Sequence, residues 1–397
     1  MTMAGQSAPR ISIKETEPAA QPIEGMATTI TGFVGFAERG PLNTPTRVTS
    51  ITEYHRIFGG YLPEQAGDTR WLPCAVDAFF NNGGSTLFIT RVTGAGNDPE
   101  DIDRIIAGAD GEPAERTGIA AMKNLPQIRI VAIPGITGQQ AQGALISHCE
   151  EMQNRFAILD CRPFPDLREL QDQRDLFHSK YAALYYPWIR MLLPDSREPV
   201  TVPPSGAIAG IYVRTDIRHG VHKSPANKRI KGAIIGRGNP AGSASRVIPA
   251  EEYAILGSRG INGIREIPGE GVCVWGARTL FNEGPGKYVH VRRLTLFVEE
   301  SIREGIRWAV FEPNDEYLWA RVRAVVTGFL ICLWRDGALA GTKPDQAFFV
   351  RCDRTTMSQD DIANGRLICV IGIAPLKPAE FLIFRIALWR EGSAVTE

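Results

Sequence analysis

Apolar runs of strand length alternate with helical patterns through the first half of the chain. Strands are expected at 30–36, 47–49, 86–92, 127–133, 156–160 and 182–188, and helices at 50–58, 71–80, 139–154, 166–177 and 205–218. The first of these helices opens with the capping box Ser50-Ile-Thr-Glu53. Alternating strands and helices are typical of a mostly parallel sheet covered by helices. Residues 27–255 are therefore predicted to form an α/β domain.

The pattern changes after residue 218. Residues 219–250 are rich in Lys, Arg, Gly, Ser and Pro, which predicts an exposed loop. Beyond them, strands are expected at 271–275, 288–291 and 346–352, and helices at 292–310, 315–334 and 357–364. The helix at 315–334 is apolar almost all round near its end, which predicts a central buried element. Residues 256–380 are thus predicted to form a second domain of α+β type.

Both ends of the chain carry strand patterns with no neighbouring element to pair with. Within residues 1–26, the stretch Arg10–Glu15 alternates Ile11 and Ile13 with polar residues. The pattern at 365–390 predicts a pair of apolar strands that runs almost to the last residue. An unpaired apolar strand favours addition to another sheet. Assembly with other copies is therefore the first functional hypothesis.

Composition and charge narrow the function classes. The 397 residues are 44% hydrophobic, and 44 basic side chains balance 44 acidic ones. A neutral chain lacks the electrostatic attraction that nucleic-acid and membrane-surface binders use, so we predict no nucleic acid and no membrane contact. The first residues lack a signal-peptide profile and the apolar run 324–334 is too short for a bilayer, which predicts a cytoplasmic protein. The seven cysteines are scattered without a Cys-x-x-Cys pair, as expected for reduced, mostly buried thiols.

Motifs for catalysis, cofactors and metals are weak. The glycines of 236–242 miss the dinucleotide-binding spacing by one residue, and no Gly-x-Ser-x-Gly motif occurs. His219 and His222 lack a third ligand at a paired spacing, and the basic stretch 223–237 has no aromatic residue to stack on a base. We predict no enzyme activity, no cofactor and no metal. Two alternatives stay open: an α/β enzyme that binds a small ligand, and a non-contractile structural polymer.

Four stretches of the sequence resemble the sheath proteins of contractile phage tails and related contractile injection systems. They cover about half of the chain, and the resemblance is vague from about 95 to 250. The stretches are 30–45 with 52–59 (ITGFVGFAERGPLNTP and TEYHRIFG), 81–92 (NNGGSTLFITRV), 288–294 with 311–315 (YVHVRRL and FEPND), and 365–384 with APLKPAEF at 374–381.

The resemblance implies a two-domain sheath subunit with extended arms. The 27–255 domain would face outward, and 256–380 would form the inner domain. The arms, residues 1–26 and 381–397, would add strands to the sheets of neighbouring subunits through Ile11, Ile13, Leu382, Phe384, Ile386 and Leu388. A polar helix with Met357, Gln359, Asp360, Asp361 and Asn364 would face the inner tube, its two carboxylates meeting basic residues there.

The resemblance also implies the binding partners and the cellular location of the protein. Such a subunit would polymerise with itself as a contracting helical tube around an inner tube protein, and would meet baseplate and tail-terminator or cap proteins. It would assemble in the cytoplasm as part of a phage tail or tail-like particle, with or without later release from the cell.

Overall fold

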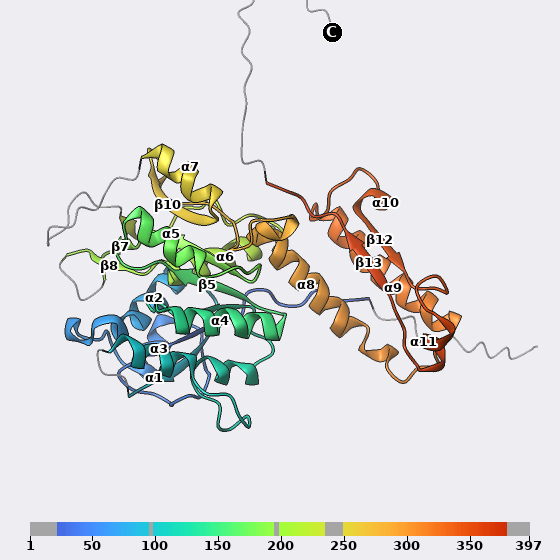
Figure 1. Cartoon of the computed structure of the whole chain (residues 1–397), viewed down its shortest axis with the longest axis horizontal. Coiled ribbons are helices and arrows are strands. Elements are labelled where there is room, and N and C mark those ends of the chain that lie inside the picture. Colours follow the sequence, from blue (N-terminus) through green and yellow to red (C-terminus); the bar gives the residue numbers. More distant parts are fainter. Residues whose placement is uncertain (1–21, 95–97, 194–197, 235–248, 379–397) are drawn as a thin grey trace, which may run out of the picture.

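The computed structural model describes residues 22–94, 98–193, 198–234 and 249–378, which form a large α/β domain and a smaller C-terminal domain (Figure 1). One eight-stranded sheet forms the centre of the large domain, in the order β11-β10-β6-β5-β4-β1-β3-β2. The strands are β1 (Thr31–Phe36), β2 (Thr46–Val48), β3 (Leu87–Val92), β4 (Ile130–Ala132), β5 (Phe156–Asp160), β6 (Ala182–Tyr186), β10 (Ile261–Ile267) and β11 (Gly271–Trp275).

The six inner strands of this sheet run parallel, and only the edge strands β2 and β11 pair antiparallel. The predicted parallel α/β architecture is confirmed. A smaller sheet, β8-β7-β9, is made of β7 (Ile189–Met191), β8 (Val200–Val202) and β9 (Ala233–Ile234). Strands β1 and β5 at the centre of the sheet are buried on both faces, which is why they appear in the sequence as nearly continuous apolar runs.

Helices cover both faces of the large sheet. Phe33 of β1 meets the ring of Phe79 at 5.7 Å on one face, while Gly32, one residue earlier, faces Met122 on the other. Helices α2 and α6 cross closely on the first face, because Gly206 leaves room for the backbone of Ala75. The helices are α1 (Ile51–Phe58), α2 (Trp71–Asn81), α3 (Pro99–Ala107), α4 (Gln139–Met152), α5 (Leu167–Asp175), α6 (Ser205–His219) and α7 (Ala250–Ser258), with 3-10 turns η1 (Glu64–Arg70) and η2 (Gly118–Asn124).

The structure corrects the predicted domain boundary at residue 256. Strands β10 and β11 complete the large sheet, since β10 pairs with the free edge of β6 and β11 closes the hairpin. The stretch 288–291, predicted as a strand, begins helix α8 (Val289–Gly305) instead. The C-terminal domain therefore starts at α8. The predicted loop 219–250 is also more ordered at its start than expected, because Ile230 is buried and its N–H donates to Val272 O of β11.

The C-terminal domain packs α8, α9 (Glu316–Arg335) and a two-stranded sheet around its own apolar core. Its remaining elements are the 3-10 turn η4 (Arg307–Ala309), α10 (Pro344–Ala347), β12 (Phe348–Arg351), α11 (Gln359–Ala363) and β13 (Val370–Ile373), while the 3-10 turn η3 (Pro285–Lys287) leads into α8. The expected burial of α9 holds for one face only, which carries Val322, Val326 and Leu330. Its other face, with Ala324, Gly328 and Cys332, is exposed.

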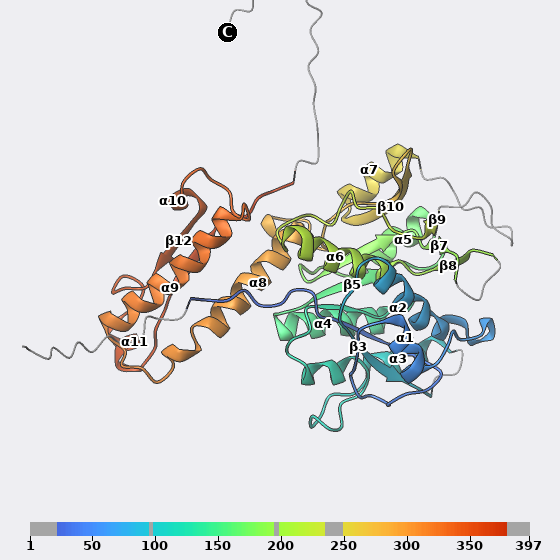
Figure 2. The ribbon, with the colours of Figure 1, turned by 180° about the vertical axis from the view of Figure 1, so that it is seen from behind.

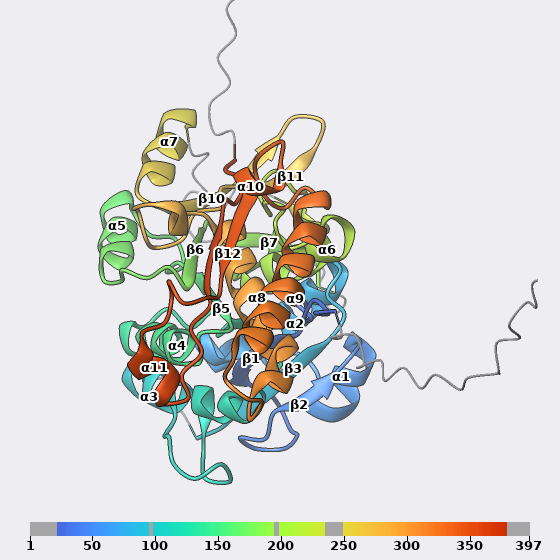
Figure 3. The ribbon, with the colours of Figure 1, turned by 90° about the vertical axis from the view of Figure 1, so that its right-hand side faces the viewer.

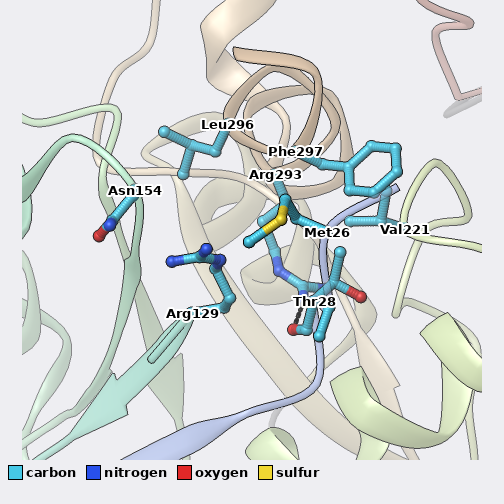
Figure 4. Close-up of a pocket in the computed structure, with 9 residues that line it drawn as sticks. Met26, Thr28, Arg129, Asn154, Val221, Arg293, Leu296 and Phe297 are labelled. Atoms are coloured by element: carbon cyan, nitrogen blue, oxygen red, sulfur yellow. Dashed lines mark hydrogen bonds between the residues drawn. The ribbon is translucent and has the colours of Figure 1, made fainter. Parts of the chain in front are cut away.

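A buried ion pair fastens α8 to the large domain. Both Arg293 guanidinium Nη atoms bind the Asp216 carboxylate of α6, at 2.6 and 2.9 Å, and Nη2 also donates to Thr28 O at 3.2 Å. About two turns further along α8, Glu300 meets Arg129, the residue just before β4, at 3.3 Å. Figure 4 shows Arg129 and Arg293 around a small cavity between β4, α8 and the chain segment that precedes β1. Because a buried charge pair tolerates little change of geometry, α8 is held rigidly on the large domain.

Candidate assembly surfaces of the C-terminal domain

The two-stranded sheet β12–β13 has free edges. The strands pair antiparallel, with Phe348 opposite Ile373 and Arg351 opposite Val370, and among the described residues no further strand joins them. Figure 3 shows β12 running beside α9, with α8 behind. A two-stranded sheet is marginal by itself, and here it is stabilised by packing on α9. Two free edges offer backbone groups to two incoming strands.

The register decides which backbone groups point outward. Ala374 N donates to Ala347 O at 2.8 Å, so residues 347 and 374 form a hydrogen-bonded pair. In an antiparallel ladder such pairs alternate with non-bonded pairs. The N–H and C=O groups of a non-bonded pair point away from the partner strand. Val350 and Ile371 form a non-bonded pair, so each presents its backbone N–H at an outer edge. Their side chains contact the domain core, whereas Phe349 and Val370 on the opposite face are exposed.

The two ends of the described chain leave from opposite ends of α8. Ile23 packs against Gly305 at the end of α8, and Met26 N donates to Ser301 Oγ at 3.0 Å. Leu376 meets His290 at the start of the same helix through a backbone hydrogen bond. Residues 290 and 305 are separated by about 22 Å along a helix with 1.5 Å rise per residue. Figure 2 shows the N-terminal segment following α8 away from the large domain. The two arms thus start at well-separated points.

The predicted linker residues lie outside the described residues. This applies to Ile11 and Ile13 at the N-terminal end and to Leu382, Phe384, Ile386 and Leu388 at the C-terminal end. Their pairing therefore stays a prediction.

The predicted inner-tube helix is α11, and its charges are partly paired within the chain. Arg366 bonds both carboxylates, Nη2 to Asp360 Oδ2 and Nε to Asp361 Oδ1, each at 2.8 Å. The Ser358 hydroxyl and N–H also donate to Asp361, and these bonds, with Arg366, lower the pKa of Asp361 to about 2. Two carboxylates and one guanidinium leave one net negative charge. Arg366 was not predicted as part of this surface, although it lies one residue after Gly365, which follows the helix.

The five residues predicted for this helix differ in their exposure to solvent. Gln359, Asp360 and Asn364 are exposed, and Asp361 is half-buried. Met357 lies before the helix starts and is buried in the core of the C-terminal domain. Its prediction as a surface contact is wrong, because its apolar side chain packs inward beneath the loop.

Cavities in the described part of the chain are small or open. The cavity at Arg129 and Arg293 has a volume of about 20 Å³, room for a single water-sized group. A broad depression lies between the start of α9 and α11, lined by Asn314, Glu316, Arg354 and Gln359 among others. No group of three or more His, Cys, Asp or Glu side chains suited to a metal occurs in the described ranges. By length and composition α9 could cross a membrane, yet one face of it forms the core of the C-terminal domain.

The comparisons with known proteins agree with this geometry. Residues 285–388 match the family model of the phage tail sheath C-terminal domain, a range that contains α8, α9 and both strands of the small sheet. The chain also matches the contracted helical sheath of the anti-feeding prophage with a TM-score of 0.74 and 28% identity, over 96% of this chain and 99% of that one. The chain is a contractile tail sheath protein.

Two further relatives support this identification. The PVC sheath complex of an extracellular contractile injection system, in its contracted state, is 27% identical with a TM-score of 0.74, over 97% of this chain and 98% of that one. A protein of Pseudomonas aeruginosa (strain UCBPP-PA14) described as a putative prophage major tail sheath protein is 26% identical over 87% of this chain and 85% of its own. The likeness extends over both domains of the sheath protein.

Proposed function

We propose that this sheath protein polymerises into a helical tube around an inner tube and contracts to drive that tube through a target envelope. The observation that carries the proposal is the small sheet, whose two free edges match in number the two chain ends that leave opposite ends of α8. An arm of one copy that adds to the sheet of the next makes a head-to-tail contact. Such contacts propagate into a helical lattice when they do not close a ring.

Contraction in this proposal is a rearrangement of rigid subunits. The ion pair of Arg293 with Asp216 holds α8 on the large domain, so the two domains move together. The arms, residues 1–26 and 381–397, keep neighbours connected while the bodies rotate and slide. Each subunit needs to release only about a few kcal/mol, the usual difference between two conformational states, because many subunits act in concert. Nucleotide hydrolysis has no part in this mechanism, and the protein acts as a non-enzyme.

The inner tube is proposed to meet α11. Gln359, Asp360 and Asn364 are exposed there, and the single net negative charge left by Asp360, Asp361 and Arg366 suits one basic side chain on the partner. The C-terminal domain would then lie inward and the large domain outward. Baseplate and tail-terminator or cap proteins would bind the two ends of the tube. The assembly would form in the cytoplasm as part of a phage tail or tail-like particle.

The arm's role can be tested by deleting residues 1–20, which lie wholly within the N-terminal arm. The truncated protein should stay soluble with native circular dichroism, since both described cores remain, but should form no tubes in electron micrographs. Normal tubes from the truncated chain would refute strand exchange through this arm. Micrographs of the full chain should show tubes of two lengths and widths, and a single invariant form would favour a non-contractile polymer.

A further inference from the structure

Two cysteines lie opposite each other at the end of the small sheet. The register of β12 and β13 pairs Arg351 with Val370, and one step further it places Cys352 opposite Cys369. Because residues 347 and 374 form a hydrogen-bonded pair, the alternation makes 352 and 369 a non-bonded pair. Cα atoms of such pairs lie about 4.5 Å apart. Disulfides span Cα separations of roughly 4.4–6.8 Å, so the backbone is already placed for a bond.

The side chains agree with this placement. Cys352 is fully buried and Cys369 is half-buried, and both face the core of the C-terminal domain beside α9. Their thiols are hydrogen-bonded to each other. That bond raises the pKa of Cys352 and lowers the pKa of Cys369, so Cys369 is the thiol that ionises first. By contrast, burial raises the pKa of Cys74 and of Cys149 to about 12.

We propose that Cys352 and Cys369 form a reversible disulfide when the protein meets a small-molecule disulfide such as oxidised glutathione. The Cys369 thiolate attacks one glutathione sulfur, forms a mixed disulfide and releases one glutathione thiolate. Cys352 then loses its proton, attacks the Cys369 sulfur and expels the second glutathione thiolate. Two protein thiols are oxidised, one glutathione disulfide is reduced to two thiols, and the two thiol protons pass to solvent or to the released thiolates.

The disulfide would close the loop 353–368, which carries α11 and Arg366. Closing a loop reduces the number of unfolded conformations and so stabilises the folded arrangement. It would also tie β12 to β13 at one end of the sheet. On the function proposed above, the oxidised form would present a stiffer surface to the inner tube. The bond itself depends only on the fold of the isolated subunit.

The test uses the full-length protein, incubated as soluble subunits with oxidised glutathione and then alkylated. Peptide mapping should find residues 352 and 369 joined, and the melting temperature of the oxidised protein should rise by about 5 °C or more and return after treatment with dithiothreitol. Cys369→Ser should abolish both effects. Cys332→Ser, which removes the exposed cysteine of α9, should leave both unchanged.

Two outcomes would overturn the proposal. One is that Cys352 and Cys369 of the wild-type protein both stay free to alkylation after oxidation. The other is a glutathione adduct that persists on Cys369 with no bond to Cys352. Both are read on the wild-type protein, so a variant that fails to fold does not obscure the answer. Because neither measurement needs tubes, a failure here is distinct from a failure of sheath assembly.

Discussion

At the residue scale, Arg155 and His148 form a buried polar pair in the large domain. Arg155, the residue just before β5, is fully buried between α4 and η2, and its Nη1 donates to His148 Nε2 at 2.9 Å. The same guanidinium donates to the carbonyl oxygens of Met122 and Leu125. Burial, together with the charge of Arg155, lowers the pKa of His148 to about 3. His290 at the start of α8 shows a similar effect, since burial lowers its pKa to about 4.

The lowered pKa of His148 predicts that acid destabilises the folded protein. Between pH 6.5 and about pH 3 an unfolded His148 binds a proton that the folded one does not, so the free energy of unfolding falls as the pH falls. One such proton contributes a slope of about 1.4 kcal/mol per pH unit. His148→Gln keeps an acceptor for Arg155 but cannot titrate, so its slope between pH 6 and 4.5 should be smaller by about that amount. Urea denaturation of the soluble subunit at several pH values measures it.

A second substitution separates titration from hydrogen bonding. His148→Leu should show the same reduced slope, but should also be less stable at pH 7, because Arg155 then loses a buried acceptor. An unchanged slope in both variants would mean that His148 is protonated in the folded protein.

At the element scale, the ladder alternation in β12 and β13 allows one edge to be blocked at a time. Val350→Pro removes the outward N–H of β12, and Ile371→Pro removes that of β13, while the bonds between the two strands stay intact. Proline is tolerated at edge positions whose N–H is not used in the sheet. Each variant should keep native circular dichroism and lose tube formation if an arm adds at that edge, as seen by electron microscopy.

Alanine variants control for the lost side chains. Val350→Ala and Ile371→Ala shorten the same core-facing groups but retain the N–H, so they should assemble at concentrations close to those of the wild type. Tubes formed normally by both proline variants would show that neither edge receives a strand.

The elements that could be predicted from the sequence are those whose residues carry a local signal. The helix at 50–58 begins at Ser50, whose side chain accepts from Glu53 N, as its capping box indicates. Strand β11 was also predicted, at 271–275, whereas β10 (Ile261–Ile267) was not. The membership of both strands in the large sheet depends on the free edge of β6, which no local pattern reveals. The pairs Arg293–Asp216 and Cys352–Cys369 were missed for the same reason, because each joins residues brought together only by folding.

At the scale of the whole molecule, the resemblance in the sequence was strong at both ends of the chain and weak from 95 to 250. The structure shows why residues 95–250 still fold like the known sheath proteins although their sequence resemblance is weak. Strands β4, β5 and β6 are buried on both faces, where any apolar residue of suitable size fits. Such strands retain their architecture while their sequences diverge. The C-terminal domain is matched more specifically, since the helix junction at 311–315 and the β13 segment must keep defined turns.

The neutral charge of the whole chain predicts how sheath assembly responds to salt. The proposed contacts between subunits are backbone hydrogen bonds and apolar side chains, and 44 basic residues balance 44 acidic ones, so no large repulsion or attraction needs screening. Raising NaCl from about 50 to about 500 mM shortens the screening length to about 4 Å but should change the critical concentration for tube formation by less than roughly threefold. Light scattering at fixed temperature and pH measures this, and a tenfold shift would place the dominant contacts between charged surfaces instead of between strands.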